Sequence, residues 1–526
     1  MNAPSQAISP AHPHGKYLSP LADGFPSTEA LLIHGGDARI TLNPVTGTNQ
    51  YGCPPRPQEN IAALGSATAT AISEDAFNAA QLLRDRLAQE IISRDSAEIY
   101  AREIQRVRQE LLALCDLHPP EDPEVIFGAS GTDCHLMAAQ LAAASAKKPL
   151  CVLLVDAAET GSGVPQALTG HHFSSRAALG TGVIPGEIIE KSQYIDYINV
   201  SIRLADGSAR PGAEVDAEFA RHVVSATAAG QQVLLTMVDV SKTGLIAPSV
   251  ACAVDLQQRF PDTLTILVDA CQFRFSTATL RNYLAQGFMV GITGSKFLTG
   301  PSFSGALLIP KPLSRRLLTH SVADKLQLYS AQADWPEGVG AAHGLKKMPN
   351  FGLLLRWEGA LAELRKFRML DNQTEITEFL QTCATVINRQ LNTHPLLSGL
   401  EVNPLNRSPF AAESGWDHIQ TIFPFLLYKP GADTRRIPLI SAETKQIYLA
   451  LQDHTNIENP IQLAQPVSAG FRDGIEVSAL RLCISSRLIV EALQNHGRSK
   501  QEVIGRIKNA LESVAQLVKL DAENKV

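Results

Sequence analysis

The 526-residue sequence predicts an α/β protein with a large, mostly parallel sheet domain and a smaller C-terminal α/β domain. Between residues 125 and 310, short apolar segments alternate with helical ones. These apolar segments are almost continuously hydrophobic, which is typical of strands that are buried on both faces of a parallel sheet. After Pro312 the pattern changes to long helices, short strands and Pro/Gly loops. A chain of this length exceeds one hydrophobic core, so at least two domains are expected.

Residues 1–70 contain many Pro, Gly and polar turn residues, and they predict an irregular N-terminal arm. A helical pattern begins after Ser73, which is a good N-cap with an acidic first turn behind it, and continues to about Leu117. The large domain is expected to span 71–312. Its predicted strands are 125–130, 150–157, 197–204, 232–240, 263–270, 288–295 and 304–310, and its predicted helices are 132–148, 214–230, 250–260 and 279–287.

The small domain is expected to span 313–526. Its first part, 351–394, is long and helical. Residues 400–485 mix short strands with Pro/Gly loops, and 499–520 form an amphipathic helix. This combination predicts a second, smaller α/β unit.

Composition excludes several classes of protein. The 46 basic and 52 acidic residues give a net charge of −6, so there is no overall attraction to nucleic acid or to an anionic membrane. No apolar segment approaches the ~20 residues that cross a bilayer, and the N-terminus lacks a signal-peptide pattern. The eight cysteines form no CxxC pair, which argues against zinc and disulfides. We therefore expect a cytoplasmic protein with no metal, nucleic-acid or membrane partner.

Two residues suited to chemistry follow neighbouring apolar strands. Asp269 ends one strand, and Lys296 comes just after the next, in a turn rich in small and hydroxyl residues. Because ligands of parallel sheets bind at the carboxyl ends of the strands, both side chains are expected in one crevice. An earlier strand ends in GASGTD (128–133), which opens a helix and offers backbone N–H groups and hydroxyls to an anion.

A lysine, a carboxylate and a phosphate-binding turn are the parts that pyridoxal 5′-phosphate (PLP) requires. The lysine forms a Schiff base with the aldehyde, and the carboxylate keeps the pyridine nitrogen protonated, so that the ring accepts electrons. We therefore predict PLP as the cofactor, with Lys296 and Asp269 as catalytic residues. Lys242 is the rival lysine, but it precedes Asp269, which is the wrong order for this architecture.

These motifs resemble the cofactor-binding region of fold type I PLP-dependent enzymes, particularly the class V aminotransferase and cysteine desulfurase group. That group's pattern is a strand, Asp-x-x-Gln, a hydroxyl-rich turn with Lys, then Gly-Pro and a further Gly. SGTD (130–133) resembles its phosphate-loop SGTE, which assigns Ser130, Gly131 and Thr132 to the phosphate. The other matching residues are Asp269, Gln272, Thr293, Lys296, Gly300, Pro301 and Gly305.

The resemblance implies the aspartate aminotransferase-like fold, with a seven-stranded sheet, and a homodimer with shared active sites. It implies cofactor contacts for Gln272, Thr293 and Ser295. VSKTGLIAP (240–248) resembles the segment that approaches the phenolic oxygen of PLP, which makes Ser241 a candidate.

Two further residues are implied as substrate contacts. Arg481, in ALRLCIS, resembles the late arginine that binds the substrate α-carboxylate, with Arg487 and Arg472 as alternatives. Tyr51, in NQYGCPP, resembles a residue of the N-terminal segment that lines the substrate mouth.

The sequence departs from the family pattern at two points. The histidine that often stacks on the pyridine ring is replaced by Thr160, with His171 and His172 beyond it, whereas His135 is assigned to packing. Cysteine desulfurases also use a mobile cysteine before the late arginine. No cysteine lies between 384 and 482, so persulfide chemistry is disfavoured.

The function that these residues predict is that of a PLP-dependent enzyme acting on a small amino acid through an external aldimine, most simply an aminotransferase-like enzyme. A lyase, either a C–S lyase or a decarboxylase, is the first alternative. A PLP-binding protein without turnover is the second alternative. A nucleotide-binding α/β enzyme is disfavoured, because neither GxGxxG nor GxxxxGK[ST] occurs.

Overall fold

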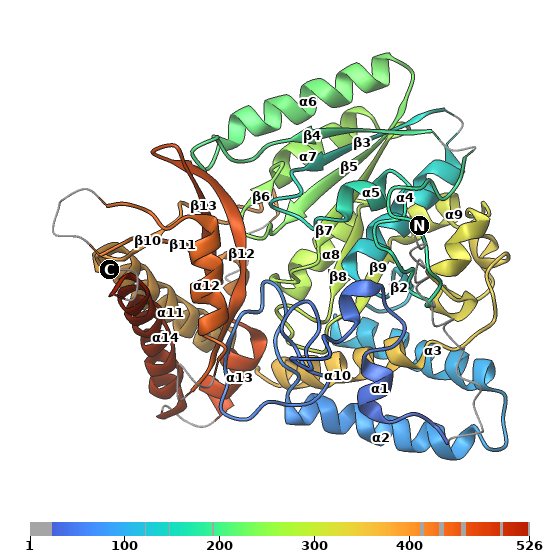
Figure 1. The fold of residues 1–526 in the computed structure, drawn as a ribbon. Coiled ribbons are helices and arrows are strands. Elements are labelled where there is room, and N and C mark those ends of the chain that lie inside the picture. Colours follow the sequence, from blue (N-terminus) through green and yellow to red (C-terminus); the bar gives the residue numbers. More distant parts are fainter. Residues whose placement is uncertain are drawn as a thin grey trace, which may run out of the picture.

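A computed structural model of the chain describes residues 24–120, 122–146, 148–191, 194–410, 415–430, 436–453, 459–494 and 498–523. The predicted α/β architecture is confirmed, because a large sheet flanked by helices stands beside a smaller sheet (Figure 1). The start of the predicted N-terminal arm lies outside the described residues. None of the helices in the described ranges is both long enough and apolar enough to span a membrane.

The large sheet has the strand order β2–β9–β8–β7–β5–β3–β4, with the short β6 paired to β5. On this path only β9 runs antiparallel to its neighbours, so the predicted large, mostly parallel sheet is confirmed. With β6 the sheet has eight strands, one more than predicted. The strands are β2 Glu124–Gly128, β3 Leu150–Val155, β4 Ile195–Val200, β5 Gln232–Asp239, β6 Ile246–Ala247, β7 Leu264–Ala270, β8 Met289–Thr293 and β9 Gly305–Ile309.

Helices cover both faces of this sheet. Alternate residues of a strand point to opposite faces, so each face presents apolar side chains that helices bury. On β7, Val268 packs into the hydrophobic core of one face and Leu267 into that of the other. The Leu267 face is covered by α4 (Gly131–Ser145), α5 (Val164–Leu168) and α9 (Lys311–Leu317). The Val268 face is covered by α2 (Glu74–Glu90), α3 (Ser96–Leu114), α6 (Gly212–Ala228), α7 (Val250–Arg259), α8 (Thr277–Ala285) and α10 (Phe351–Arg368).

The small sheet has the order β1–β12–β13–β11–β10. Its edge strand β1 comes from the N-terminal segment that the sequence predicts to be irregular, and it pairs in parallel with β12. The strands are β1 Ala62–Leu64, β10 Leu397–Gly399, β11 Ile422–Leu427, β12 Ile461–Arg472 and β13 Ile475–Cys483. The accompanying helices are α11 Gln373–Thr393, α12 Ser441–Ala450, α13 Ser486–Gln494 and α14 Arg498–Glu523.

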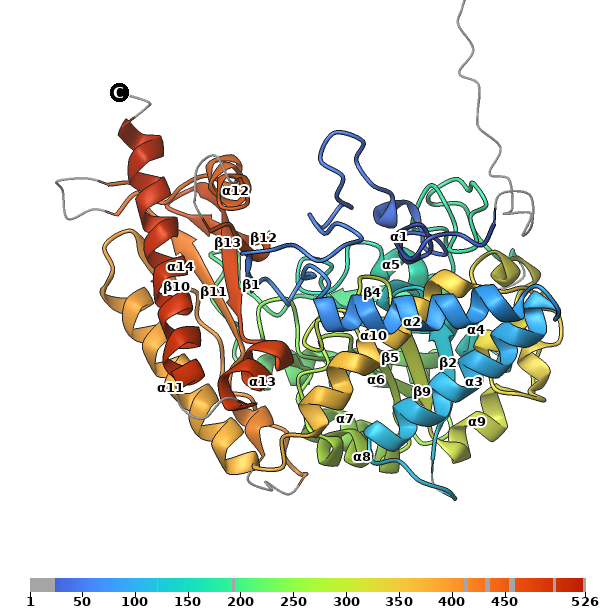
Figure 2. The same ribbon diagram turned by 90° about the horizontal axis from the view of Figure 1, so that it is seen from below.

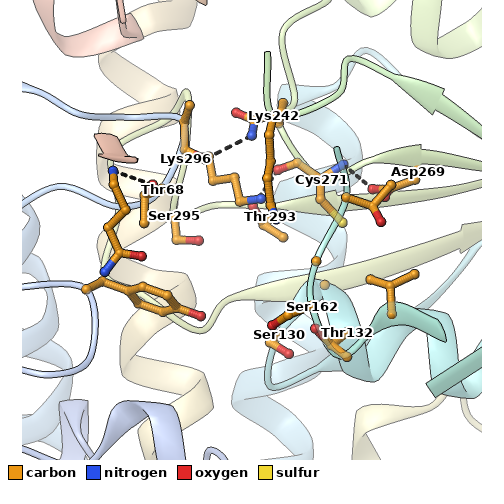
Figure 3. A pocket seen from close by; sticks show the side chains of 18 of the residues that line it. Thr68, Ser130, Thr132, Ser162, Lys242, Asp269, Cys271, Thr293, Ser295 and Lys296 are labelled. Carbon is orange, nitrogen blue, oxygen red and sulfur yellow. Dashed lines mark hydrogen bonds between the residues drawn. The ribbon is translucent and has the colours of Figure 1, made fainter. Parts of the chain in front are cut away.

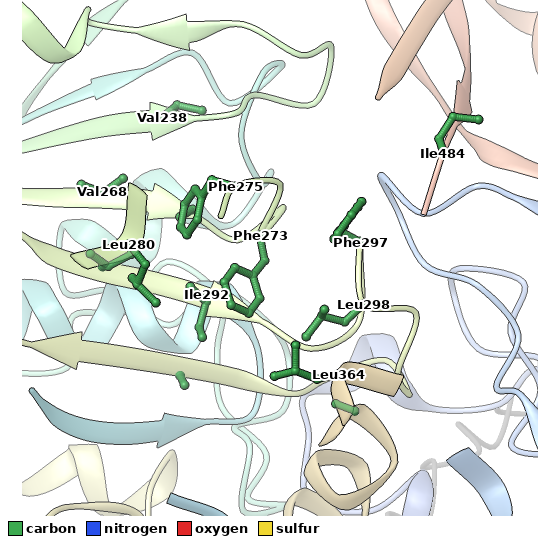
Figure 4. Close-up of a cluster of buried hydrophobic side chains, with 14 of the residues drawn as sticks. Val238, Val268, Phe273, Phe275, Leu280, Ile292, Phe297, Leu298, Leu364 and Ile484 are labelled. Carbon is green, nitrogen blue, oxygen red and sulfur yellow. The ribbon is translucent and has the colours of Figure 1, made fainter. Parts of the chain in front are cut away.

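The two sheets are joined by a continuous hydrophobic core. Figure 4 shows it running from Val268 and Ile292 in the large sheet, past Phe297, to Ile484 just after β13. The helix α10 belongs to the predicted small domain by its place in the chain. It nevertheless packs against α2 and α3, which cover the large sheet. The domain boundary at 312/313 therefore stays a prediction.

The N-terminal segment crosses between the two sheets. It begins with α1 (Thr28–Leu32), which packs on α10, and continues past the start of α4 to the small sheet (Figure 2). Gln465 of β12 donates a hydrogen bond to the carbonyl of Gln50, at 2.8 Å. The segment thus lies over the carboxyl ends of the large sheet's strands.

Candidate functional site

A cavity of about 230 Å³ lies at the carboxyl ends of β2, β5, β7 and β8. The N-terminal segment and β12–β13 complete its walls. Figure 3 shows Lys242 and Lys296 extending into it, with Ser130 and Thr132 grouped at the start of α4. All predicted site residues except Ser241 line this cavity: Tyr51, Ser130, Gly131, Thr132, Asp269, Gln272, Thr293, Ser295, Lys296 and Arg481.

Lys296 enters the cavity from the turn that follows β8. The next residue, Phe297, fixes the turn, because its ring stacks on Trp416 at 5.1 Å and its carbonyl accepts hydrogen bonds from Ser486. Removal of the amine from solvent lowers the pKa of Lys296. A lower pKa increases the share of neutral amine, which is the nucleophilic form.

Asp269 forms a buried pair with His135. Asp269 lies on the same face of β7 as Leu267 and therefore points toward α4, where His135 Nε2 lies 3.3 Å from its Oδ2. His135 Nδ1 is 2.7 Å from the carbonyl of Gly131, to which it donates. Burial opposes both charges, but the two groups outweigh it, so the pKa of Asp269 is lowered and that of His135 is raised. Asp269 therefore stays a carboxylate.

The sequence predicts a packing role for His135, whereas the structure places its ring against Asp269. His135 lies four residues after Gly131, which is one helical turn beyond the anion-binding turn. On a helix this spacing places a side chain on the same face as the turn. The spacing is therefore the sequence feature that could have assigned His135 to the site.

The turn at 130–133 is arranged as an anion site. Ser130 caps α4: its Oγ accepts from the Asp133 N–H at 3.3 Å and donates to Asp133 Oδ2 at 2.5 Å. Gly131 and Thr132 are the first residues of α4, so their N–H groups have no partner within the helix. A Cβ on Gly131 would lie 2.5 Å from Cys271 Sγ, so glycine allows the backbone to approach the cavity floor.

Arg39 also lines the cavity, although no sequence motif indicates it. It lies in the short 3-10 helix Ala38–Ile40 of the N-terminal segment. Its guanidinium pairs with Asp37 and reaches Ser130 Oγ at 3.2 Å. No periodicity in this irregular segment distinguishes Arg39 from any surface arginine.

Arg481 is a fully buried cation whose hydrogen-bond partners are all neutral. Its Nη1 donates to the carbonyl of Lys242 at 3.0 Å, and its Nη2 donates to Thr68 Oγ1 at 3.0 Å and to the carbonyl of Gln465 at 2.7 Å. Its Nε has no partner among the described residues. An uncompensated buried guanidinium favours an incoming carboxylate.

The two alternative arginines lie outside the cavity lining. Arg487 forms an ion pair with Glu363 at 2.9 Å, and Arg472 ends β12 at the hairpin to β13, where it donates to the carbonyl of Phe471. Neither is therefore supported as the carboxylate ligand.

Ser241 is the one predicted site residue that does not line the cavity. Its Oγ donates to Glu159 Oε2 at 2.7 Å, and Arg203 holds Glu159 at 2.6 Å. Glu159 lines the cavity, whereas Ser241 behind it does not. The neighbouring Lys242 lines the cavity instead, and its Nζ donates to the carbonyl of Ala157 at 3.0 Å. Burial lowers the pKa of Lys242 to about 8. Adjacent side chains in a turn point in different directions. The sequence therefore predicted the segment that reaches the cavity, but not which of its side chains enters.

Thr160 lines the cavity, whereas His171 and His172 do not. His172 is buried elsewhere, with its Nδ1 2.6 Å from the Tyr329 hydroxyl, and His171 Nδ1 lies 3.0 Å from Thr169 Oγ1. Neither histidine is therefore available to cover a ring in the cavity.

Three of the remaining predicted residues are held in place by hydrogen bonds. Gln272 Nε2 donates to the carbonyl of Ala67 at 3.0 Å, and Thr293 Oγ1 donates to that of Cys271 at 2.7 Å. The Tyr51 hydroxyl accepts from Arg39 Nη1 at 3.3 Å. These contacts fix the polar groups around Lys296.

One group of described residues could approach a metal ion. Ligand atoms of His135, Asp269 and Cys271 lie within 4.8 Å of one another. Burial and the adjacent Asp269 raise the pKa of Cys271 well above its ordinary value. A thiol that stays protonated is a poor metal ligand, so this group suits an organic cofactor better.

No protein-family model and no curated protein matches the chain. Among solved structures, the cystine C–S lyase C-DES in complex with cysteine persulfide matches at a TM-score of 0.52 and 15% identity, covering 85% of this chain and 97% of that one. A C-DES mutant with glycine covalently linked to its PLP cofactor matches equally well, covering 96% of that chain. A NifS-like protein matches at 0.50 and 12% identity, covering 86% and 99%. These likenesses confirm the predicted fold type I architecture.

Proposed function

We propose that the chain is a PLP-dependent enzyme that removes the Cα proton of an α-amino acid, with aminotransferase-like chemistry as the first candidate. The observation that carries the proposal is the convergence of Lys296, Asp269 and the start of α4 on one cavity. These groups come from distant parts of the chain. C-DES, which shares the fold, carries PLP.

The polar character of the cavity supports an anionic occupant. Arg481 Nε and Ser302 Oγ belong to lining residues and are buried without a hydrogen-bond partner among the described residues. Such atoms cost free energy unless a ligand or water satisfies them. Arg481 lacks a carboxylate partner among its hydrogen bonds, and Lys296 points into the same space. A phosphate and a substrate carboxylate would balance these charges.

Four groups would hold the cofactor. Lys296 Nζ would bind its aldehyde carbon covalently, and Asp269 would keep a proton on its pyridine nitrogen. Hydroxyls and N–H groups at the start of α4, with Thr293 and Ser295 opposite, would bind its phosphate. When bound, PLP supplies a ring that takes up the electrons released when a bond at the substrate Cα breaks.

The protein's own residues determine which bond breaks. Arg481 would hold the substrate α-carboxylate as an anion, and an ion-paired carboxylate is stabilised against loss as CO₂. Lys296, whose pKa burial lowers, can then take the proton from Cα. This arrangement supports Cα–H cleavage over decarboxylation.

A C–S lyase is the second candidate, since β-elimination begins with the same proton transfer, and C-DES is a cystine C–S lyase. Persulfide formation on the protein is disfavoured, because Cys271 is the one cysteine among the described lining residues and lies buried beside Asp269. A requirement for a keto-acid co-substrate distinguishes transamination from elimination. We further propose a homodimer, as the family resemblance implies, and a cytoplasmic location, as the scattered cysteines indicate.

The test is an absorbance spectrum of the purified protein with PLP, before and after borohydride. We expect a visible band that borohydride abolishes, and a pyridoxyl mass on the peptide containing Lys296. Lys296→Ala should lack both signals, whereas Lys242→Ala should keep the label on Lys296. A colourless wild type with added PLP, or a label on Lys242, would overturn the proposal. Bound PLP without spectral change for any amino acid would indicate a non-catalytic binding protein.

A further inference from the structure

The Arg39 guanidinium lies between a buried carboxylate and the first residues of α4. One edge is occupied by Asp37, with Nε 2.9 Å from Oδ1 and Nη2 2.5 Å from Oδ2. The other edge faces hydroxyls: Nη1 and Nη2 each lie 3.5 Å from Thr132 Oγ1, and Nη2 lies 3.2 Å from Ser130 Oγ. These contacts are long for hydrogen bonds, so this edge is open to a stronger acceptor.

The orientation of this guanidinium is fixed by its surroundings. The group lies 5.4 Å from the Phe303 ring centroid and 5.9 Å from that of Phe173, and 20% of the Arg39 side chain is exposed. Asp37 is fully buried, and its carbonyl accepts from Arg176 at 2.9 Å. Arg39 is therefore held by the protein before any ligand binds, which lowers the entropic cost of binding.

The donors around Arg39 match a phosphate better than a carboxylate. The N–H groups of Gly131 and Thr132, the Thr132 hydroxyl and one guanidinium edge meet at the start of α4, and three phosphate oxygens can use all of them. The second cavity-lining guanidinium, that of Arg481, has separate partners in Thr68 and Gln465 and no carboxylate partner among its hydrogen bonds, so the two guanidinium groups occupy different parts of the cavity.

We propose that Arg39, supplied by the N-terminal segment and oriented by Asp37, binds a phosphate group at the start of α4. Given the proposed function, this group is the phosphate of PLP. The N-terminal segment is then part of the cofactor site. Asp37 is a positioning residue, because it acts through Arg39.

The experiment compares the binding of PLP, pyridoxal and inorganic phosphate to wild type and Arg39→Met. Absorbance titrations measure the two aldehydes, and the unfolding midpoint of the PLP-free protein measures phosphate. Arg39→Met should weaken PLP binding by about 10- to 100-fold and should leave pyridoxal binding unchanged. Arg39→Lys, which keeps the charge but loses the fork, should recover part of this loss.

Two further variants separate a local effect from misfolding. Arg56→Met is the matched control, because Arg56 lies in the same N-terminal segment, is 71% exposed and pairs only with Glu29 in the described residues; its PLP affinity should equal that of wild type. Asp37→Asn should give a PLP affinity between those of wild type and Arg39→Met. Far-UV circular dichroism of each variant establishes that it is folded.

The outcomes separate this inference from the proposed function. If PLP does not bind wild type, but stabilisation by inorganic phosphate depends on Arg39, the phosphate site stands and the proposed function fails. If PLP and phosphate bind Arg39→Met and Arg39→Lys as they bind wild type, the inference is wrong. A loss confined to amino-acid affinity would also overturn it, because Arg39 would then bind substrate.

Discussion

His135 Nε2 lies 3.3 Å from Asp269 Oδ2, and both side chains are almost completely buried. Through its Nδ1, the same imidazole donates to the carbonyl of Gly131. The carboxylate proposed for the pyridine nitrogen is thus linked to the turn proposed for the phosphate. A single histidine therefore sets the spacing between the two ends of the site.

His135→Ala should lower the free energy of unfolding by about 3 kcal/mol, because it leaves Asp269 buried without its partner. The raised pKa of His135 contributes stability below its ordinary value of 6.5, and this is lost as pH rises through the folded value. The lowered pKa of Asp269 contributes stability above 3.8, and this is lost as pH falls through the folded value. The deficit should thus be largest between about pH 4 and about pH 6.5.

Urea unfolding at a series of pH values measures this deficit. His118→Ala is the control, because His118 is 65% exposed and its neighbour Asp116 is also at the surface. It should show no comparable pH-dependent loss. A deficit for His135→Ala that is constant from pH 4 to pH 8 would mean that the imidazole only fills space.

Asp133→Asn should stabilise the protein at alkaline pH. Burial and the nearby Asp37 raise the pKa of Asp133 to about 7, so the folded state holds a proton that the unfolded state loses above about pH 4. Wild-type stability should therefore fall relative to the variant as pH rises from about 4 to about 7. Urea unfolding at pH 5 and pH 8 checks this, with Asp255→Asn on α7 as an exposed control. Lower stability of Asp133→Asn at pH 8 would contradict the expectation.

Gly305→Ala should disturb the anion-binding turn without touching a ligand. Gly305 pairs with Gly128 across β9 and β2, and a Cβ at this position would lie 2.5 Å from the carbonyl oxygen of Ser130. Backbone must then move, at a cost of about 1–3 kcal/mol in unfolding free energy. The affinity for inorganic phosphate should fall as well. Gly212→Ala, where no heavy atom lies within 4 Å of the added carbon, should do neither.

The large sheet and the position of Lys296 and Asp269 could be predicted. Parallel strands bring their carboxyl ends to one edge of the sheet, and this does not depend on the conformation of the loops. Gly131 and Thr132 followed from the strand-to-helix junction in the same way, and the resemblance to the SGTE loop added Ser130. These predictions depend on local pattern and on that resemblance.

Arg39 could not be predicted, because its contact with Ser130 joins residues 91 apart through a segment without periodicity. The place of Lys242 in the cavity could not be predicted for a different reason. The turn at 241–244 buries Ser241 against Glu159 and directs Lys242 into the cavity, and this depends on tertiary packing. The sequence pattern located this segment but could not orient its side chains.

Arg481→Met should separate substrate binding from cofactor binding. Arg481 donates to Thr68 Oγ1 and to the carbonyls of Lys242 and Gln465, and its bond to a substrate carboxylate would be its one hydrogen bond to an anion. The variant's affinity for a reactive amino acid should fall roughly 100-fold, with PLP affinity close to that of wild type. Spectral titration of the PLP-loaded protein measures the first affinity, and titration of the PLP-free protein measures the second. Arg472→Met, at the β12–β13 hairpin, should change neither. If Arg481→Met lost PLP affinity while retaining amino-acid affinity, Arg481 would belong to the cofactor end of the cavity, and the substrate carboxylate would need a different cation.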